Sequence, residues 1–390
     1  MLYDTFGFPI ELTEEISADN GFKVDLEGFQ LELAKQKERA RAARVSNQSM
    51  NNQNEEYLNF KLKSEFIGYE TLYANSQVIA IFKDGKQIET ADGMLQLVLG
   101  NLTPFYAEMG GQIGDQGELT FDGMNFDVIN TVKLPNGQHL QFVDMKQTTI
   151  KVGDSVAVSV NSEFRKAICQ NHSATHLLNE ALRKVLGGHV LQQGSQVTNE
   201  NLRFDFNHYE SLTTKQILEI EKMVRDVIVK DYPVCIRETT LEEAKALGAQ
   251  ALFGEKYGNI VRLVDMQFSK ELCGGTHVKT TGEIKQFAIT SIESKGSGIF
   301  RIVAVASDNL MDEIKFAVQN MRDDILDIIT KIDKVYQKAL EEGYKLTKPS
   351  INLPIIIGSY QDIVEYRICS ENAKKAQKAL EKDYENLKRI

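Results

Sequence analysis

The sequence predicts an α+β protein in which a small β-barrel precedes a two-layer α/β domain, with helical segments on either side. Between residues 57 and 160, short apolar runs alternate with Asp-Gly and Asn-Gly pairs, a pattern typical of antiparallel strands joined by tight turns. From residue 161 onward, apolar residues recur at steps of three and four and then give way to alternating runs. This second pattern predicts helices packed against a sheet.

We expect four regions, because the composition changes character along the chain. Residues 1–55 are predicted to be a helical segment that ends in a linker rich in Asn, Gln and Ser. Residues 56–160 are predicted to form the barrel, and residues 161–307 the α/β domain. Residues 308–390 are predicted to form two long helices on either side of a short strand at residues 355–357.

Composition and charge narrow the classes to which the chain can belong. About 42% of the 390 residues are hydrophobic, which is enough for several cores. The sequence has no run of 18 apolar residues and no signal peptide, so we expect a cytoplasmic protein that does not enter a membrane. Its four cysteines are scattered, which favours a reducing compartment over a disulfide framework. A net charge of −10 argues against a protein that coats nucleic acids non-specifically, but it is compatible with a local basic surface.

Turn and capping residues place the individual elements. Asp84-Gly85 and Asp122-Gly123 are predicted hairpin turns of the barrel. Asn161 or Ser162 is expected to cap a long helix that ends at Gly187-Gly188. Strands are predicted at residues 78–82, 95–99, 126–129, 156–160, 202–206, 260–264, 288–292 and 300–305.

Two short motifs about a hundred residues apart supply metal-binding side chains. His172 and His176 lie one turn apart on one face of the predicted long helix. Cys273 and His277 have the same spacing and enclose two glycines. Three imidazoles and one thiolate are a full tetrahedral set for Zn²⁺, so the sequence predicts one zinc ion per chain. Because four protein ligands close a tetrahedral site, a purely structural zinc that joins the two motifs is the competing interpretation.

A third motif lies within the predicted barrel, at Thr103–Gln112 (TPFYAEMGGQ). Its Gly110-Gly111 pair permits another group to approach the backbone closely, and it equally permits a simple turn. On spacing alone the simple turn is the favoured interpretation. Neither a Ser-His-Asp triad nor a phosphate-binding P-loop is visible in the sequence.

Together these motifs resemble those of alanyl-tRNA synthetases. The resemblance rests on Thr103–Gln112, His172–His176 (HSATH), Leu202–Phe206 (LRFDF), Gly248–Gly258 (GAQALFGEKYG) and Cys273–His277 (CGGTH). It covers residues 1–307 and corresponds to the editing region of that family and the tract before it. Residues 308–390 are similar only in position and helical character to the start of the family's C-terminal region.

The resemblance implies a hydrolase that removes serine or glycine from mischarged tRNA(Ala). A pocket built for alanine rejects these two amino acids poorly, since one methyl or one hydroxyl changes binding by only about 1–3 kcal/mol. A second, hydrolytic site must then remove the errors. The family's aminoacylation core, which uses ATP and Mg²⁺, is expected upstream of Met1, so this chain alone is not expected to make alanyl-tRNA(Ala).

The resemblance also implies roles for individual residues. Zinc would be held by His172, His176, Cys273 and His277. The catalytic candidates are Gln192, Thr103 and Gln112, of which Gln192 is expected to orient the seryl ester or the attacking water. The candidates for substrate contact are Gly110, Gly111 and Arg301. The family's Gly-Ile-Arg-Arg-Ile is GIFRI here, so Phe300 replaces an arginine and puts a tRNA contact at this edge in doubt.

Two other interpretations of the whole chain remain open. An editing module of the threonyl-tRNA synthetase type shares the paired motifs, although Gly274-Gly275-Thr276 and the long match before it favour alanine. The second alternative belongs to a different functional class. It is an inactive module that is held together by zinc and that binds tRNA or dimerises. The apolar stripe of the helix after Asp308 would support a homodimer, but packing within the chain is the commoner use of such a stripe. For Gln192, the alternative is a solvated loop residue.

Overall fold

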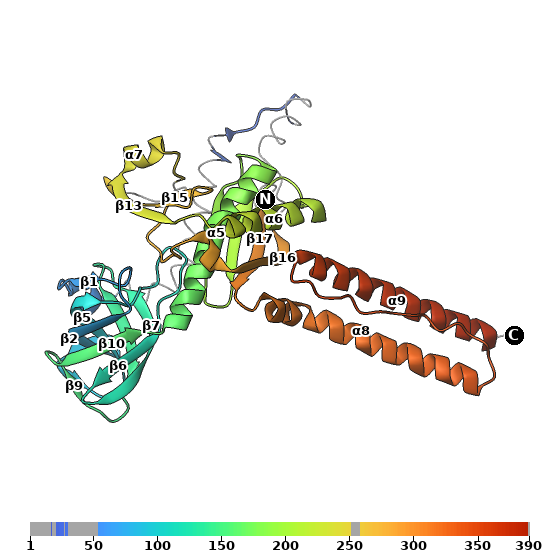
Figure 1. Cartoon of the computed structure of the whole chain (residues 1–390), viewed down its shortest axis with the longest axis horizontal. Helices are drawn as coiled ribbons and strands as arrows, with labels where there is room; N and C mark the ends of the chain where they lie inside the picture. Colours follow the sequence, from blue (N-terminus) through green and yellow to red (C-terminus); the bar gives the residue numbers. More distant parts are fainter. Residues whose placement is uncertain (1–16, 18–20, 27, 30–53, 251–257, 389–390) are drawn as a thin grey trace.

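The computed structural model describes residues 17, 21–26, 28–29, 54–250 and 258–388, and it confirms the α+β class. A closed barrel, an α/β domain and a two-helix arm follow one another along the chain (Figure 1). Most of the helical segment and linker predicted for residues 1–55 lies outside the described residues, as does the part of the GAQALFGEKYG motif at residues 251–257.

Six antiparallel strands form the closed barrel, and the pairing of the last strand with the first completes the ring. Their order around the ring is β2 (Tyr73–Lys83), β5 (Met94–Thr103), β8 (His139–Asp144), β7 (Met124–Lys133), β6 (Gly117–Phe121) and β10 (Ser155–Val160). Apolar side chains from all six strands fill the interior. All four barrel strands predicted from the sequence are present, in β2, β5, β7 and β10.

The predicted hairpin turns of the barrel are confirmed. Asp84 and Gly85 have φ values of 50° and 77°, and Asp122 and Gly123 have values of 50° and 74°. Positive φ at both central residues defines the turn whose twist matches that of antiparallel strands, and Asp-Gly tolerates it well. The first pair joins β2 to β3 (Lys86–Ile88), and the second joins β6 to β7.

Short elements surround the barrel. They are α4 (Glu55–Asn59), β1 (Ser64–Phe66), which runs parallel to β5, and the pair β4 (Thr90–Ala91) and β9 (Ile150–Lys151). Asn54 caps α4 by accepting a hydrogen bond from the Glu56 N–H at 2.9 Å. Helix α4 covers the outside of β2, where the rings of Tyr57 and Phe82 meet edge to face, 4.8 Å apart.

The α/β domain has a four-stranded antiparallel sheet with helices on one face. The strand order is β11 (Gln192–Val197), β12 (Leu202–Asn207), β17 (Ile299–Ser307) and β16 (Gln286–Gly296). Helices α5 (Ser162–Leu186) and α6 (Thr214–Lys230) cover that face. Burial alternates along β12, so Phe204 and Phe206 point into the core with the helices while Arg203 and Asp205 point away.

Helix α5 begins and ends where its capping residues predict. The Asn161 side chain accepts a hydrogen bond from the Phe164 N–H at 3.0 Å, and Gly187 follows the last turn with a φ of 119°. The middle of the helix is buried on all sides, although many of its residues are polar. Each buried polar group therefore needs a partner from another element, which fixes the position of the helix precisely among its neighbours.

A small second sheet carries the other metal-binding motif. It consists of β13 (Cys235–Thr240), β14 (Ile260–Asp265) and β15 (Lys270–Leu272), with α7 (Leu241–Ala246) beside it. The turn after β15 holds Cys273 and His277 and leads into the 3₁₀ turn η1 (Thr281–Ile284).

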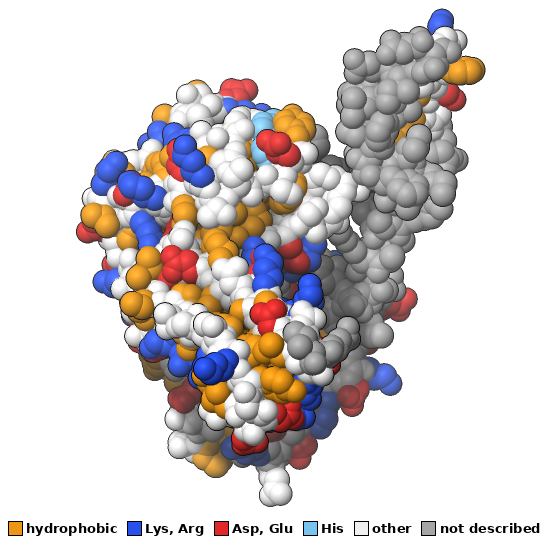
Figure 2. All heavy atoms as spheres, turned by 90° about the vertical axis from the view of Figure 1, so that its right-hand side faces the viewer, with side chains coloured by type: hydrophobic (Ala, Val, Ile, Leu, Met, Phe, Trp, Pro, Cys, Tyr) orange, Lys and Arg blue, Asp and Glu red, His pale blue; other side chains and the backbone are white. Residues whose placement is uncertain are grey.

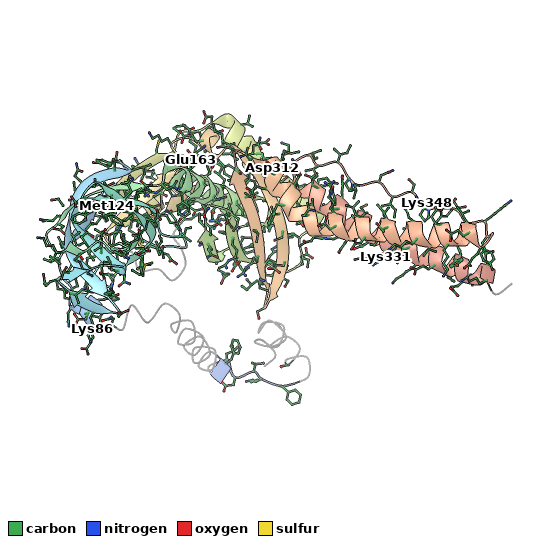
Figure 3. All side chains as sticks on the ribbon, turned by 90° about the horizontal axis from the view of Figure 1, so that it is seen from below. Lys86, Met124, Glu163, Asp312, Lys331 and Lys348 are labelled. Atoms are coloured by element: carbon green, nitrogen blue, oxygen red, sulfur yellow. The ribbon has the colours of Figure 1, made fainter. Side chains whose placement is uncertain are left out.

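Helices α8 (Leu310–Glu341) and α9 (Tyr360–Lys388) lie side by side and form the arm (Figure 3). Asp312 marks the base of the arm, and Lys331 and Lys348 lie farther out along it. Most of the apolar stripe of α8 is buried within the chain, and several of its residues join the core that α9 shares. Packing inside the chain is thus the main use of this stripe.

The short strand predicted at residues 355–357 is wrong. These residues have no regular secondary structure, and no described strand pairs with them. Ile355 and Ile357 are 82% and 65% exposed, and Ile356 between them packs on the core. The apolar run that predicted a strand therefore belongs to a connecting segment, which Ile356 anchors to the core.

The face around the end of the arm has no single sign of charge. Figure 2 shows Lys and Arg side chains interspersed with Asp, Glu and apolar side chains on this face. Within the described part of the chain, no helix is both long enough and apolar enough to cross a bilayer.

Candidate metal centre

Helix α5 and the turn after β15 bring the four predicted ligands together. His172 and His176 come from the middle of α5, and Cys273 and His277 from the turn. Each residue offers one ligand atom, and these atoms all lie within 4.8 Å of one another. The three imidazole rings surround the same point, with centroids 4.4, 4.7 and 5.3 Å apart. The cluster could hold one metal ion.

The barrel fixes the orientation of His172 through Gln112. His172 Nδ1 donates a hydrogen bond to Gln112 Oε1 at 2.7 Å, and His172 Nε2 lies 3.4 Å from Cys273 Sγ. The Thr276 N–H also donates to Gln112 Oε1, at 2.9 Å, which identifies this atom as the amide oxygen. Because an amide oxygen only accepts, Nδ1 carries the proton and Nε2 presents its lone pair to the cluster.

His277 has one satisfied and one unsatisfied ring nitrogen. Its Nδ1 lies 3.2 Å from Ser173 Oγ, which also accepts a hydrogen bond from the Val278 N–H at 3.1 Å. Its Nε2 is buried and has no hydrogen-bond partner among the described residues. An unsatisfied buried polar atom costs about 1–3 kcal/mol, and a metal ion at the cluster would satisfy this one. The residues present therefore fit a bound metal.

His176 faces a buried carboxyl group. Its Nδ1 lies 3.4 Å from Glu271 Oε2, although the two are not aligned for a hydrogen bond. The other oxygen of Glu271 accepts hydrogen bonds from Asn179 Nδ2 at 2.8 Å and Ser269 Oγ at 3.2 Å. Burial raises the pKa of Glu271 to about 7. A carboxyl group behind an imidazole is a common means of orienting a histidine ligand.

Burial keeps the three imidazoles neutral. It lowers the pKa of His176 to about 3 and lowers the pKa of His172 and His277 well below the usual range. The nearby guanidinium of Arg262 lowers all three further. Neutral imidazole is the form that binds a metal, so the site needs no deprotonation of these rings at neutral pH.

The two glycines of the second motif have different neighbours. A Cβ atom on Gly275 would lie 2.0 Å from His172 Cε1, a separation that real structures do not show. A Cβ atom on Gly274 would meet only Met109 Cε, at 3.3 Å, at the end of a flexible side chain. Gly275 is therefore required for the approach of His172, whereas Gly274 has room.

The barrel loop at Gly110-Gly111 lies against β11. The two glycines have φ values of 62° and 83°, and the Gly111 carbonyl accepts a hydrogen bond from the Val197 N–H at 2.7 Å. A Cβ atom on Gly111 would lie 2.7 Å from Ser195 O. The turn favoured by spacing is confirmed at these two residues, and Gly111 in addition makes a close backbone contact with another strand.

The three catalytic candidates differ in how directly they contact the four metal-binding residues. Gln112 is fully buried and contacts the ligand His172 directly. Gln192 begins β11, is half-buried, and donates to Ser195 Oγ at 3.0 Å, next to the Gly111 loop. Thr103 ends β5 and is buried in the barrel, where its hydroxyl accepts from Gln141 Nε2 at 3.4 Å. Their catalytic roles stay predictions.

Arg301 and Phe300 lie on opposite faces of the four-stranded sheet. Arg301 donates to both oxygens of Asp205 at 2.7 Å, on the face away from α5. Phe300 is buried in the core, and its ring centroid lies 6.1 Å from that of Phe206. Arg301 is therefore not brought together with the histidines of α5, and its contact with tRNA stays a prediction.

Sequence reasoning missed the residues that hold the ligands in place. These are Tyr69, Ser173, Arg262, Glu271 and Thr276. Ser173 and Thr276 lie inside the two motifs, where a small polar residue beside a ligand was a usable signal. Tyr69, Arg262 and Glu271 carried no such signal, because their contacts depend on the packing of three regions.

Comparisons with known proteins identify the family to which the chain is similar. The family of class II (A) tRNA synthetases matches residues 1–164, and the second additional domain of threonyl and alanyl tRNA synthetases matches residues 261–303. Alanine–tRNA ligase of Acholeplasma laidlawii is 44% identical over 385 residues, which cover 98% of this chain and 42% of that protein. The same enzyme of Lysinibacillus sphaericus is 43% identical over 353 residues, covering 88% and 38%. That of Bacillus anthracis is 43% identical over 347 residues, covering 86% and 39%.

Both family matches are to tRNA synthetases, and the second spans the turn that carries Cys273 and His277. By these matches the chain belongs to the class II aminoacyl-tRNA synthetases. Within that class it belongs to the alanyl-tRNA synthetase family, and it spans about two fifths of the length of the curated relatives that it matches.

Proposed function

We propose that the metal-binding cluster and the residues around it form an editing site, which hydrolyses the ester bond of seryl- or glycyl-tRNA(Ala). The observation that carries the proposal is the cluster of His172, His176, Cys273 and His277, of which Cys273 and His277 lie in the region that matches the second additional domain. Gln112 of the barrel contacts this cluster, so the site lies where barrel and α/β domain meet. A site between two domains is a common place for a substrate.

We propose Zn²⁺ as the ion, because three neutral imidazoles and one thiolate are its preferred ligands. When bound, zinc supplies a Lewis acid that can polarise an ester carbonyl or hold the amino group of the substrate. The chain's own residues orient the ligands: Gln112 fixes the tautomer of His172, and Ser173 contacts the ring of His277. Gln192, whose amide already bonds Ser195, is proposed to orient the ester or the attacking water.

The substrate preference follows from the limits of binding energy. The synthetic site of an alanine enzyme cannot strongly reject an amino acid with one methyl fewer or one hydroxyl more. An editing site gains selectivity by bonding the extra hydroxyl of serine, and polar side chains such as Gln192 are available nearby. Ligation of alanine to tRNA(Ala) with ATP and Mg²⁺ is proposed only for the whole synthetase.

The second candidate function is an inactive, metal-stapled module that binds tRNA or another copy of the chain. One observation favours it: four protein ligands would fill a tetrahedral ion and leave no open position. The threonyl-type editing module receives less support, since the curated relatives quoted above are alanine enzymes. A cytoplasmic location fits either function, and a homodimer through the C-terminal arm remains a proposal.

A deacylation assay separates the two functions. Purified chain is incubated with seryl-tRNA(Ala) and with alanyl-tRNA(Ala), and the loss of ester is followed by acid precipitation. We expect selective hydrolysis of the seryl ester, its loss in Cys273→Ala, and a large reduction in Gln192→Ala. Gln193→Ala is the matched control, because Gln193 is the exposed neighbour on the same strand. Equal, slow hydrolysis of both esters by all four proteins would favour the inactive module.

Metal analysis of the purified chain tests the ion itself. We expect about one zinc per chain when no chelator is used, since sites of this kind bind tightly. Cys273→Ala should hold much less. A wild-type protein that is folded but nearly free of zinc would contradict the assignment of the ion.

A further inference from the structure

Two side chains hold three consecutive carbonyl groups of the turn that begins at Cys273. Arg262 Nη1 donates hydrogen bonds to the carbonyl oxygens of Cys273 and Gly275, each at 2.9 Å. Tyr69 Oη donates to the carbonyl oxygen of Gly274 at 2.5 Å. With all three carbonyls engaged, the turn cannot rotate a peptide plane without breaking a hydrogen bond.

Arg262 and Tyr69 come from different regions and contact each other. Arg262 lies on β14 of the small sheet, and Tyr69 follows β1 at the edge of the barrel. The guanidinium carbon of Arg262 lies 4.0 Å from the centroid of the Tyr69 ring. This cation–π contact keeps both donors in place while they bond the turn. Tyr69 and Gly274 are 205 residues apart, so the contact exists only when the barrel is docked.

Holding the carbonyls also directs the N–H groups of the turn. The Gly275 N–H lies 3.3 Å from Cys273 Sγ, and the Thr276 N–H donates to Gln112 Oε1 at 2.9 Å. A hydrogen bond to sulfur favours the thiolate that binds metal, and Gln112 in turn orients His172. Because the carbonyl groups of the turn are held, its N–H groups point in fixed directions, and they position the ligands Cys273 and His172.

We propose that Arg262 and Tyr69 form a clamp that positions Cys273 for the metal, so that the barrel is a structural part of the metal centre. Both are positioning residues, because they act through the turn and not on the substrate. The proposal rests on the metal site proposed above and is independent of which tRNA is the substrate. It implies that metal affinity depends on a tyrosine that is remote in sequence from every ligand.

Cobalt titration of the metal-free protein tests the clamp. The thiolate-to-cobalt absorption band reports the bond to Cys273, and the visible ligand-field bands report the geometry. We expect Tyr69→Phe and Arg262→Lys each to weaken Co²⁺ binding about 10- to 100-fold and to reduce the thiolate band. Because the two residues act on one turn, the double variant should lose less than the product of the two single losses.

Two matched variants control for the chemistry of the substitutions. Tyr73→Phe removes a hydroxyl that bonds Asn75 Oδ1 at 2.8 Å elsewhere on the barrel, and Arg237→Lys changes an exposed arginine on β13. Both should bind Co²⁺ like the wild type. Circular dichroism melting identifies any variant that fails to fold, and Arg262→Gln, which removes the charge, should lose at least as much affinity as Arg262→Lys.

Wild-type affinity and an unchanged thiolate band in folded Tyr69→Phe and Arg262→Lys would overturn the clamp. A wild-type protein that binds no Co²⁺ would overturn the clamp together with the metal site. Normal Co²⁺ binding without hydrolysis of seryl-tRNA(Ala) would count against the proposed function and leave the clamp standing.

Discussion

Gln112 and His172 join the barrel to the metal centre through a hydrogen bond of 2.7 Å between Oε1 and Nδ1. The two residues are 60 positions apart and belong to a barrel loop and to helix α5. Gln112 also makes two hydrogen bonds with Thr276. Its Oε1 accepts from the Thr276 N–H at 2.9 Å, and its Nε2 donates to the Thr276 hydroxyl at 3.0 Å. The Gln112 side chain thus connects His172 on the helix with the turn that carries Cys273 and His277.

Replacing Gln112 should therefore weaken metal binding more than it weakens the fold. In Gln112→Ala, His172 Nδ1 loses its acceptor and the ring is free to change tautomer. We expect metal affinity to fall about 10- to 100-fold, as is typical when a group that orients a ligand is removed. Competition with a chromophoric chelator measures it, and the exposed Gln116 offers the control variant Gln116→Ala. Equal affinities in the two variants would contradict a positioning role.

Gly275 and Gly274 form a matched pair for testing the approach of His172. Gly275→Ala would put Cβ 2.0 Å from His172 Cε1, so the ring or the turn must move. We expect this variant to lose most of its bound zinc, measured per chain by atomic emission. Gly274→Ala meets only the end of the Met109 side chain and should keep its zinc. Loss of zinc in both variants to the same extent would show that the glycines act through flexibility of the turn.

Glu221 should make stability depend on pH. Its Oε2 accepts hydrogen bonds from the N–H groups of Ile289 and Tyr360, at 2.9 and 3.0 Å. Burial raises its pKa above the usual range, although Arg225 beside it acts in the opposite direction. Because the folded pKa exceeds the unfolded one, the contribution of Glu221 is fully present below the unfolded pKa. It is lost as pH rises through the folded pKa.

Glu221→Gln removes this titration and keeps an acceptor oxygen. We expect the free energy of unfolding of the variant, relative to wild type, to rise as the pH increases above the ordinary pKa of a glutamate. Urea unfolding followed by circular dichroism at several pH values measures the difference. Glu219→Gln, an exposed position on the same helix, should show no such trend. A difference that stays constant with pH would rule out the effect.

The ligand set could be predicted from the sequence because its signals are local. Asn161 and Gly187 bound a helix whose period places His172 and His176 on one face, and the structure brings both to the cluster. Barrel strands with regular alternation were equally clear. Strand β8 was missed because buried His139 and Gln141 interrupt its apolar pattern, and polar residues can be buried only where distant partners satisfy them.

The contacts that assemble the site could not be predicted in this way. Periodicity identifies the face of a helix or strand that is buried, but not the element that covers it. For Gly110-Gly111, spacing favoured a turn, which the structure confirms, but the close approach of Ser195 to Gly111 could not be predicted from it. The role of Tyr69 likewise depends on a partner 205 residues away. Such long-range contacts have no counterpart in residue spacing.

The buried ion pair of Arg165 and Asp115 is expected to fix the barrel against α5. Arg165 Nε donates to Asp115 Oδ1 at 2.9 Å, and its two terminal nitrogens bond the carbonyls of Gly68 and Pro104 at 2.6 and 3.0 Å. Both side chains are almost fully buried. Removing one partner leaves an uncompensated charge, so Asp115→Ala and Arg165→Ala should each destabilise the protein by about 3–5 kcal/mol.

A double-mutant cycle measured by urea unfolding tests this pair. The double variant should lose less free energy of unfolding than the sum of the two single losses, because it leaves no unpaired charge. Lys166→Ala is the control, since Lys166 is the next residue on α5 and its partner Asp308 is exposed; no measurable change is expected. Asp115 lies three residues after Gln112, so Asp115→Ala should also weaken metal binding. Loss of stability with normal metal affinity would separate docking of the barrel from assembly of the site.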